Sequence, residues 1–185
     1  ASCLVGSEMC IRDRDTIVWL VEGGMQQDAV DMITSLSVFF RTSLSKGKDI
    51  IPLSEEKRHT LSYLEIQQSR YRDIMEFEIN IPPELDEVMV PKLTLQPLAE
   101  NALYHGIKNK RGKGRIVVTG RREKDKCVIR VEDNGIGMSS EQIAHLFQTE
   151  TPSESHTHSS IALNNVQQRI QYHYGSAYGL SLIHI

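Results

Sequence analysis

The chain has 185 residues, 39% of them hydrophobic, which is enough for one compact domain with an appendage but not for two large domains. Its 21 basic and 24 acidic residues give a formal net charge of −3 and form no long run of one sign, which argues against nucleic-acid binding. No stretch approaches the roughly 20 consecutive apolar residues that a membrane-spanning helix needs. Cys3, Cys10 and Cys127 have neither metal-ligand spacing nor the even number of a disulfide scaffold, which favours a reducing, cytoplasmic setting.

The two ends of the chain differ in character from the rest. Residues 1–14 fit no amphipathic pattern and, together with residues 181–185, are similar to the translated adapter tails that recur at the ends of metagenomic gene models. A secretory signal is the competing interpretation of the first segment, but Glu8, Arg12 and Asp13 interrupt any apolar core. We therefore treat both ends as non-native tails and exclude them from the predicted fold.

The segment 15–46 carries the pattern of two amphipathic helices. Its apolar side chains recur at spacings of three and four residues, and the pattern is interrupted at Gly23-Gly24. The apolar positions are Ile17, Val18, Leu20, Val21, Val30, Ile33, Leu36, Phe39 and Phe40. Stripes of this kind indicate a core or a partner helix, and we predict a helical dimerisation role for this segment.

A third helix is predicted to begin with Ser54 as its N-cap and to run to about Tyr71. Two acidic residues follow Ser54 in the first turn, where the helix dipole favours negative charge. Leu61, Leu64 and Gln68 are predicted to lie along one side of this helix.

After residue 72 the pattern changes to a mixture of strands and helices. Residues 77–81 alternate with period two and end at two prolines, and residues 115–119 and 126–132 read as an antiparallel hairpin. Helical patterns cover residues 93–107 and 163–172. Because strands and helices mix without strict alternation, we predict an α+β fold with a mixed, mostly antiparallel sheet and helices on one face.

A glycine-rich turn follows the last predicted strand, in the run Asp133-Asn134-Gly135-Ile136-Gly137. Two glycines one residue apart permit backbone conformations and close ligand approach that side chains would block. The carboxylate ahead of them can accept a hydrogen bond from an amine. A tight turn that merely ends a strand is the alternative interpretation.

A second group of candidate residues lies on the helix predicted before the hairpin. On an α-helix Asn101 and His105 share one face, and a neutral amide oxygen is a suitable ligand for Mg²⁺. Glu100 adds a carboxylate beside them. The alternative is structural, with Asn101 capping the helix end and His105 lying on the surface.

Taken together, these two stretches resemble the N box and the first glycine box of the gyrase, chaperone, histidine-kinase and MutL (GHKL) superfamily of ATP-binding domains. We call residues 96–106 the N box and residues 133–137 the glycine turn. The similarity is closest to the LytS-type sensor histidine kinases, in residues 63–67, 91–106 and 163–170. The resemblance extends over residues 15 to about 180.

This resemblance implies a Bergerat-type two-layer α/β sandwich at 73–180, preceded at 15–72 by a helical dimerisation remnant. It implies ATP and Mg²⁺ as cofactors: Asn101 would hold Mg²⁺, and Asp133 would accept from the adenine amino group. Residues 139–160 would form a lid over the phosphates, and Glu100 is the catalytic candidate. The full set of implied nucleotide contacts is Asn101, His105, Gly106, Asp133, Asn134, Gly135, Gly137, Ser160, Ala162 and Leu163.

The chain departs from the family pattern in three places. The second glycine box reads Ser160-Ile161-Ala162 in place of glycines, and Tyr104 stands where a basic residue is common. The family's phosphoacceptor His belongs immediately before residues 15–17, where the adapter-like segment stands instead. None of the seven histidines replaces it, and His156 and His158 lack a third ligand for a metal site.

The resemblance implies that the parent protein transfers the γ-phosphoryl of ATP to a His and then to an aspartate of a response regulator. The parent would be a homodimer, and this fragment would be a soluble, cytoplasmic portion of a bacterial inner-membrane sensor kinase that binds no nucleic acid. We expect the fragment to bind Mg-ATP without phosphorylating itself.

Two other functions remain as alternatives. A gyrase-like or MutL-like ATPase would use a catalytic Glu one helical turn before Asn101, but Pro97 stands four residues before it and has no basic group. A regulatory module that has lost nucleotide is favoured by Ser160 and Ala162.

Overall fold

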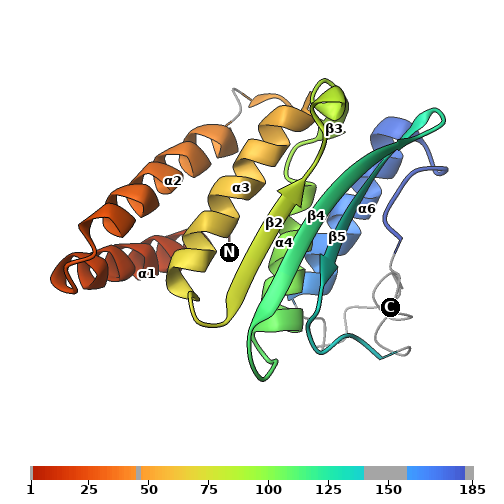
Figure 1. The fold of residues 1–185 in the computed structure, drawn as a ribbon. Helices are drawn as coiled ribbons and strands as arrows, with labels where there is room; N and C mark the ends of the chain where they lie inside the picture. The colour runs from red at the N-terminus through yellow and green to blue at the C-terminus, as the bar shows by residue number, and fades with distance from the viewer. Residues whose placement is uncertain (1, 45–46, 140–157, 182–185) are drawn as a thin grey trace.

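A computed structural model describes residues 2–44, 47–139 and 158–181, with side chains described from residue 11 in the first helix and from residue 161 in the last. A helical hairpin leads into a layer of helices on one face of a small mixed sheet (Figure 1). The described helices are α1 (Ser2–Glu22), α2 (Gln26–Leu44), α3 (Leu53–Arg70), α4 (Leu95–Asn101) and α6 (His158–Tyr174), with a 3-10 turn η2 (Pro83–Leu85) and a π-helical turn η3 (Ala102–Ile107). The described strands are β1 (Ile50–Pro52), β2 (Met75–Asn80), β3 (Met89–Pro91), β4 (Gly114–Glu123) and β5 (Lys126–Asp133).

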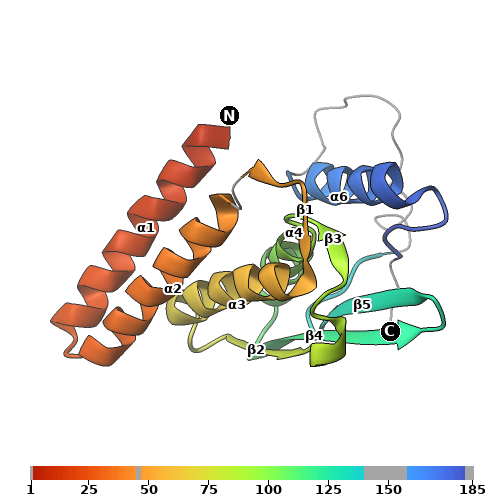
Figure 2. The same cartoon turned by 90° about the horizontal axis from the view of Figure 1, so that it is seen from above.

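The helical hairpin forms where the sequence predicts it. The chain turns at Gly23-Gly24, and Gly24 has a φ of 75°, a left-handed conformation that costs glycine little. The Met25 amide closes the turn by donating to the Leu20 carbonyl (2.8 Å). As a result α1 and α2 run side by side (Figure 2), with Leu20 and Met32 fully buried.

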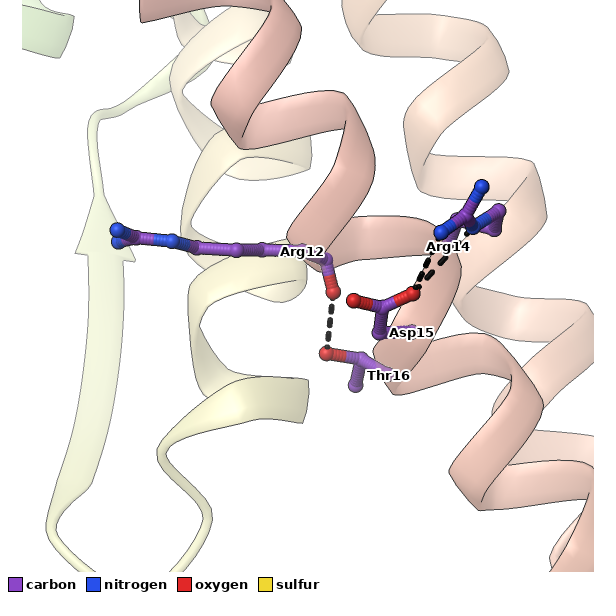
Figure 3. A network of polar contacts seen from close by, with 4 residues as sticks. All are labelled: Arg12, Arg14, Asp15 and Thr16. Carbon is purple, nitrogen blue, oxygen red and sulfur yellow. Dashed lines mark hydrogen bonds and ion pairs between the residues drawn. The ribbon is translucent and has the colours of Figure 1, made fainter.

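Residues 2–14, which we excluded from the predicted fold as a non-native tail, are part of the first helix. Helix α1 begins at Ser2 and continues without a break into the predicted helix. Within this segment Asp13 is only 3% exposed and pairs with Arg70 of α3, which fixes α1 against the rest of the molecule. The next two residues, Arg14 and Asp15, are exposed and pair with one another (Figure 3).

Helix α3 begins two residues earlier than predicted, and Ser54 is not its cap. Pro52 occupies the cap position and makes no side-chain hydrogen bond to the helix. The Leu53 and Ser54 amides donate instead to the carbonyls of Val88 (2.8 Å) and Asp86 (3.0 Å). Because the backbone around η2 satisfies these donors, no capping side chain is needed.

The stripe predicted for α3 is only partly buried. Leu64 is buried, but Leu61 is 37% exposed and Gln68 is only half-buried. The buried face of α3 includes several polar side chains, and hydrophobic periodicity cannot detect such a face. Its buried residues are Leu53, Glu56, His59, Thr60, Ser62, Tyr63, Leu64, Ile66 and Gln67.

The main sheet has the strand order β2-β4-β5 and is mixed, as predicted. Strands β4 and β5 form the predicted antiparallel hairpin, which is longer than expected and closes where Glu123 pairs with Lys126. Strand β2 pairs in parallel with β4, from Met75 opposite Gly114 to Asn80 opposite Thr119. Helices α3, α4 and α6 cover one face of this sheet (Figures 1 and 2).

A second, two-stranded sheet joins β1 to β3 and was not predicted. Ile50 pairs with Pro91 and Pro52 pairs with Met89, in antiparallel register. Strand β1 and helix α3 precede the expected boundary at residue 73, yet β1 pairs with β3 and α3 lies on the sheet beside α4 (Figure 2). Within the ranges described, no helix combines the length and apolar character needed to cross a membrane.

Candidate functional site

The N-box helix α4 starts from a turn that a buried carboxylate holds. Glu56 of α3 is fully buried and accepts from the backbone amides of Leu93 (2.9 Å), Thr94 (2.6 Å) and Leu95 (2.8 Å). Leu93 has a φ of 57°, a left-handed conformation that is unfavourable for a leucine. Three charge-assisted hydrogen bonds offset that strain and satisfy amides that a helix start leaves without partners.

The same turn is held from the opposite side by α6. The Arg169 guanidinium donates to the carbonyls of Lys92 (2.6 Å) and Leu93 (2.8 Å). Because Glu56 accepts from the amides of this turn and Arg169 donates to its carbonyls, the start of α4 is fixed relative to both α3 and α6. Arg169 lies on the helix that carries the second glycine box at its first turn.

The helix predicted over residues 93–107 is α-helical only as far as Asn101. Beyond it, η3 is a π-helical turn, and the Lys108 amide accordingly donates five residues back, to the Leu103 carbonyl (2.9 Å). The expectation that Asn101 and His105 share a face assumed α-helical spacing, which does not hold in η3. Asn101 is half-buried at the junction, whereas His105 is exposed.

Glycines bring the N box into direct contact with the glycine turn. A Cβ atom on Gly106 would lie 2.3 Å from Asp133 Oδ1, and one on Gly135 would lie 2.3 Å from the carbonyl carbon of Gly106. Both distances are far shorter than any real contact, so neither position can carry a side chain without moving its neighbour. The Ile136 amide donates to the Gly106 carbonyl (3.1 Å), which joins the two segments by their backbones.

The glycine turn is also tied to the sheet. Asp133 Oδ1 accepts from the Gly135 amide (2.9 Å), and Asn134 Oδ1 accepts from the Arg115 amide of β4 (2.8 Å). Lys110 donates to the Asn134 carbonyl (2.6 Å) and places a cation at the turn. Asp133 itself is exposed at the end of β5.

The structure describes the remaining predicted contacts only in part. Gly137 is exposed with a φ of 71°, a conformation that favours glycine. Leu163 of α6 is buried and Ala162 is half-buried. The Ser160 side chain and most of the predicted lid fall outside what the structure describes.

Glu100 faces the helix layer. Its carboxylate accepts from Gln96 Nε2 (2.7 Å), one turn earlier on α4. Burial raises the pKa of Glu100 above its ordinary value, and the Gln96 hydrogen bond only partly opposes that shift. The Glu100 carboxylate is therefore hydrogen-bonded to its own helix and not to the contact between Gly106 and Asp133.

Tyr104 stands where the sequence resemblance leads us to expect a basic residue, and its ring contacts the ammonium group of Lys108. The Lys108 ammonium lies 5.2 Å from the centre of the Tyr104 ring and 5.5 Å from that of Tyr71, both within cation–π range. Burial raises the pKa of the Tyr104 hydroxyl. With Lys110 at the glycine turn, the end of the N box thus carries cations that the sequence analysis did not single out.

Four residues that shape this candidate site were not predicted from the sequence: Glu56, Lys108, Lys110 and Arg169. The two lysines stand in a basic run directly after the N box, which was a usable signal. Glu56 and Arg169 sit in ordinary amphipathic helices, and only tertiary contact shows that they hold the same turn.

Comparison with known proteins agrees with this geometry. The family model described as histidine kinase matches residues 15–75, and the model described as histidine kinase-, DNA gyrase B- and HSP90-like ATPase matches residues 91–182. Sensor histidine kinase BtsS of Escherichia coli is 31% identical over 156 residues, which are 84% of this chain and 25% of that protein. Sensor histidine kinase YesM of Bacillus subtilis is 32% identical over 168 residues, covering 91% and 27% respectively.

Sensor protein LytS of Staphylococcus saprophyticus is 33% identical over 150 residues, covering 80% of this chain and 25% of that protein. The chain thus spans about a quarter of the length of these relatives. Two consecutive family models cover most of it, and the N box and glycine turn that carry the resemblance lie in contact. The chain therefore belongs to the LytS-like sensor histidine kinases and carries their ATPase-type domain.

Proposed function

We propose that this chain binds ATP together with Mg²⁺ and forms the catalytic portion of a sensor histidine kinase. The observation that carries the proposal is the contact of Gly106 with Asp133 and Gly135. It places the exposed Asp133 carboxylate beside the backbone of two glycines, an arrangement suited to an adenine amino group and its ring. The cations of Lys108 and Lys110 suit an anionic ligand.

The residues present fit a magnesium ion that arrives with the nucleotide. The side-chain oxygen of Asn101 would be the protein ligand, because Mg²⁺ prefers oxygen and keeps most of its coordination for phosphates and water. When bound, the ion neutralises charge that develops on the transferred phosphoryl group. His105, Gly106, Asn134, Gly137, Ser160, Ala162 and Leu163 complete the proposed nucleotide contacts.

For Glu100 we propose a supporting role. Its carboxylate is held by Gln96 within the helix layer, so it orients the N box and does not touch the phosphates. This placement also disfavours an ATPase that activates water, since Pro97 stands one turn before Asn101 and offers no base.

We further propose the setting in which this domain acts. The parent protein would pass the γ-phosphoryl of ATP to a His and then to an aspartate of a response regulator. It would act as a homodimer joined through α1 and α2, in the cytoplasmic portion of a bacterial inner-membrane sensor. This chain lacks a His in the segment before residue 15, so we expect no autophosphorylation on the usual residue.

Calorimetric titration of ATP with and without Mg²⁺ tests nucleotide binding. We expect magnesium-dependent binding that Asp133→Asn weakens at least about tenfold, because an amide replaces the carboxylate that accepts from adenine. Glu132→Gln is the matched control, since Glu132 is the neighbouring acid on β5 and pairs with Arg130. Absence of binding by the folded wild-type protein would refute the proposal and favour a nucleotide-free regulatory module.

Incubation with radiolabelled ATP tests whether this chain phosphorylates itself. We expect no acid-labile label on this chain, because phosphohistidine is acid-labile and the acceptor is missing. Acid-labile label would show that one of the seven histidines does accept the phosphoryl group.

A further inference from the structure

A chain of hydrogen bonds crosses from α2 through α3 to the N box. Thr42 Oγ1 of α2 lies 2.8 Å from His59 Nδ1 of α3, and His59 Nε2 lies 2.6 Å from Gln96 Oε1 of α4. Gln96 Nε2 then donates to Glu100 (2.7 Å). Glu100 directly precedes Asn101, so the helical hairpin is connected to the residue proposed to hold Mg²⁺.

Glu100, the last residue in this series of hydrogen bonds, determines which groups donate and which accept. Glu100 as a carboxylate can only accept, so the Gln96 amide turns its NH₂ group to Glu100 and its oxygen to His59. His59 must therefore carry a proton on Nε2, which it donates to the Gln96 oxygen. On the other side of the ring, Thr42 Oγ1 lies beside Nδ1, and the Thr42 hydroxyl donates to the Val38 carbonyl (2.9 Å). From His59 to Glu100 each group donates to the next, an arrangement in which hydrogen bonds strengthen one another.

His59 occupies the centre of this chain in a fixed position. It is 2% exposed, and its ring stacks on Phe39 of α2 with the ring centres 4.7 Å apart and an angle of 17° between the planes. The imidazole therefore has packing on its face and hydrogen bonds at both nitrogens. A shift of α2 or α3 would therefore move the His59 ring and, with it, the Gln96 side chain that its Nε2 contacts.

We propose that His59 is a positioning residue for the N box, acting through Gln96 and Glu100 on the orientation of Asn101. The inference rests on the proposed function, in which Asn101 holds the magnesium ion of ATP. Helix α4 has only 7 residues and continues into the π-helical η3, so its own backbone gives it little rigidity. Neighbouring residues on a helix project about 100° apart, so holding the Glu100 side chain against α3 sets the direction of Asn101.

The variant His59→Phe tests the role of the ring nitrogens. It keeps a planar ring to stack on Phe39 and removes both hydrogen bonds. We expect the factor by which Mg²⁺ increases ATP affinity to fall about tenfold, whereas affinity without Mg²⁺, which depends on Asp133, stays the same. The matched control His173→Phe makes the same change at an exposed position of α6 and should leave that factor unchanged.

A second readout needs no nucleotide. Hydrogen exchange of the backbone amides in residues 98–107 should become faster in His59→Phe, while exchange in the β4–β5 hairpin stays as in the wild type. Gln96→Met breaks the same chain and leaves His59 in place, so it must reproduce both effects. This variant keeps the test decisive if His59→Phe does not fold.

The outcomes separate the two proposals. Wild-type protein that binds no ATP refutes the proposed function, and hydrogen exchange still decides whether His59 positions the N box. One outcome would overturn the inference: His59→Phe or Gln96→Met lowers thermal stability but changes neither the factor by which Mg²⁺ increases ATP affinity nor hydrogen exchange in residues 98–107. The series of hydrogen bonds would then be only structural.

Discussion

At the scale of single residues, Gly106 decides how closely the N box approaches the glycine turn. Its backbone packs on Asp133 and Gly135 at distances that no Cβ atom allows. The absence of a side chain at residue 106 is therefore what places the exposed carboxylate of Asp133 beside the N box.

The variant Gly106→Ala should lower ATP affinity at least about tenfold, because its methyl group would displace Asp133 or the turn that follows. Calorimetric titration checks this. Gly24→Ala is the control: it places a side chain at a positive φ in open space, far from the site, and should cost about 1 kcal/mol of stability without changing ATP affinity. Unchanged affinity in Gly106→Ala would show that the nucleotide does not use this contact.

The candidate site residues that the sequence predicts are those whose chemistry is visible in isolation. The glycines and Asp133 stand together in one short run, and Asn101 lies in a recognisable motif. Glu56 could not be found in this way, because a glutamate in the first turn of a helix is ordinary on the surface. Its role depends on the backbone amides of residues 93–95, which only the folded chain brings to it.

At the scale of elements, the docking of α1 depends on a buried ion pair. Asp13 and Arg70 are both largely shielded from water, and they join α1 to the end of α3. Removing one member of such a pair leaves the other charge buried without its partner, whereas replacing both members by apolar residues is often nearly neutral.

We expect Asp13→Ala to lower the free energy of unfolding by about 3 kcal/mol, and the double variant Asp13→Leu with Arg70→Met to recover most of that loss. Urea unfolding measures both. A loss of less than about 0.5 kcal/mol in Asp13→Ala, the range of ordinary surface substitutions, would mean that residues 2–14 do not dock.

The same pair predicts a pH dependence. Burial raises the pKa of Asp13 above its ordinary value of 3.8, and Arg70 only partly opposes the shift. A raised pKa means that the folded state prefers the neutral acid, so this group favours folding most below its ordinary pKa and progressively less as pH rises through the folded value. Thermal unfolding between about pH 3 and pH 6 should show this decline, and Asp13→Asn should flatten it.

Elements with a strong local signal were predictable and the others were not. The break at Gly23-Gly24 and the β4–β5 hairpin follow from glycine and from alternation. Strands β1 and β3 have 3 residues each, too few to show a period, and they exist because they pair with one another. No residue type in 102–107 predicts the π-helical turn η3.

At the scale of the whole molecule, the helical hairpin exposes large apolar side chains. Trp19 on α1 is 59% exposed and Ile33 on α2 is 51% exposed, along with several neighbours. An apolar surface of this kind favours association with a second surface. The other exposed apolar side chains on these helices are Ile11, Val18, Val21, Val30, Phe40 and Leu44.

We expect sedimentation to show a dimer at micromolar concentration, and Trp19→Glu or Ile33→Glu to shift it toward monomer by placing a charge in the apolar contact. Tyr172→Glu is the control, because Tyr172 on α6 is 84% exposed and belongs to another part of the surface. A wild-type protein that stays monomeric would contradict this prediction.

The parallel pairing of β2 with β4 has a consequence for how the chain folds. The two strands are separated along the sequence by β3, α4 and η3, whereas β4 and β5 are adjacent. Local hairpins close fast and distant pairings close slowly, so β2 should join the sheet late in refolding. Until then β4 presents a free edge, and this interval is when the newly made protein is most prone to aggregate.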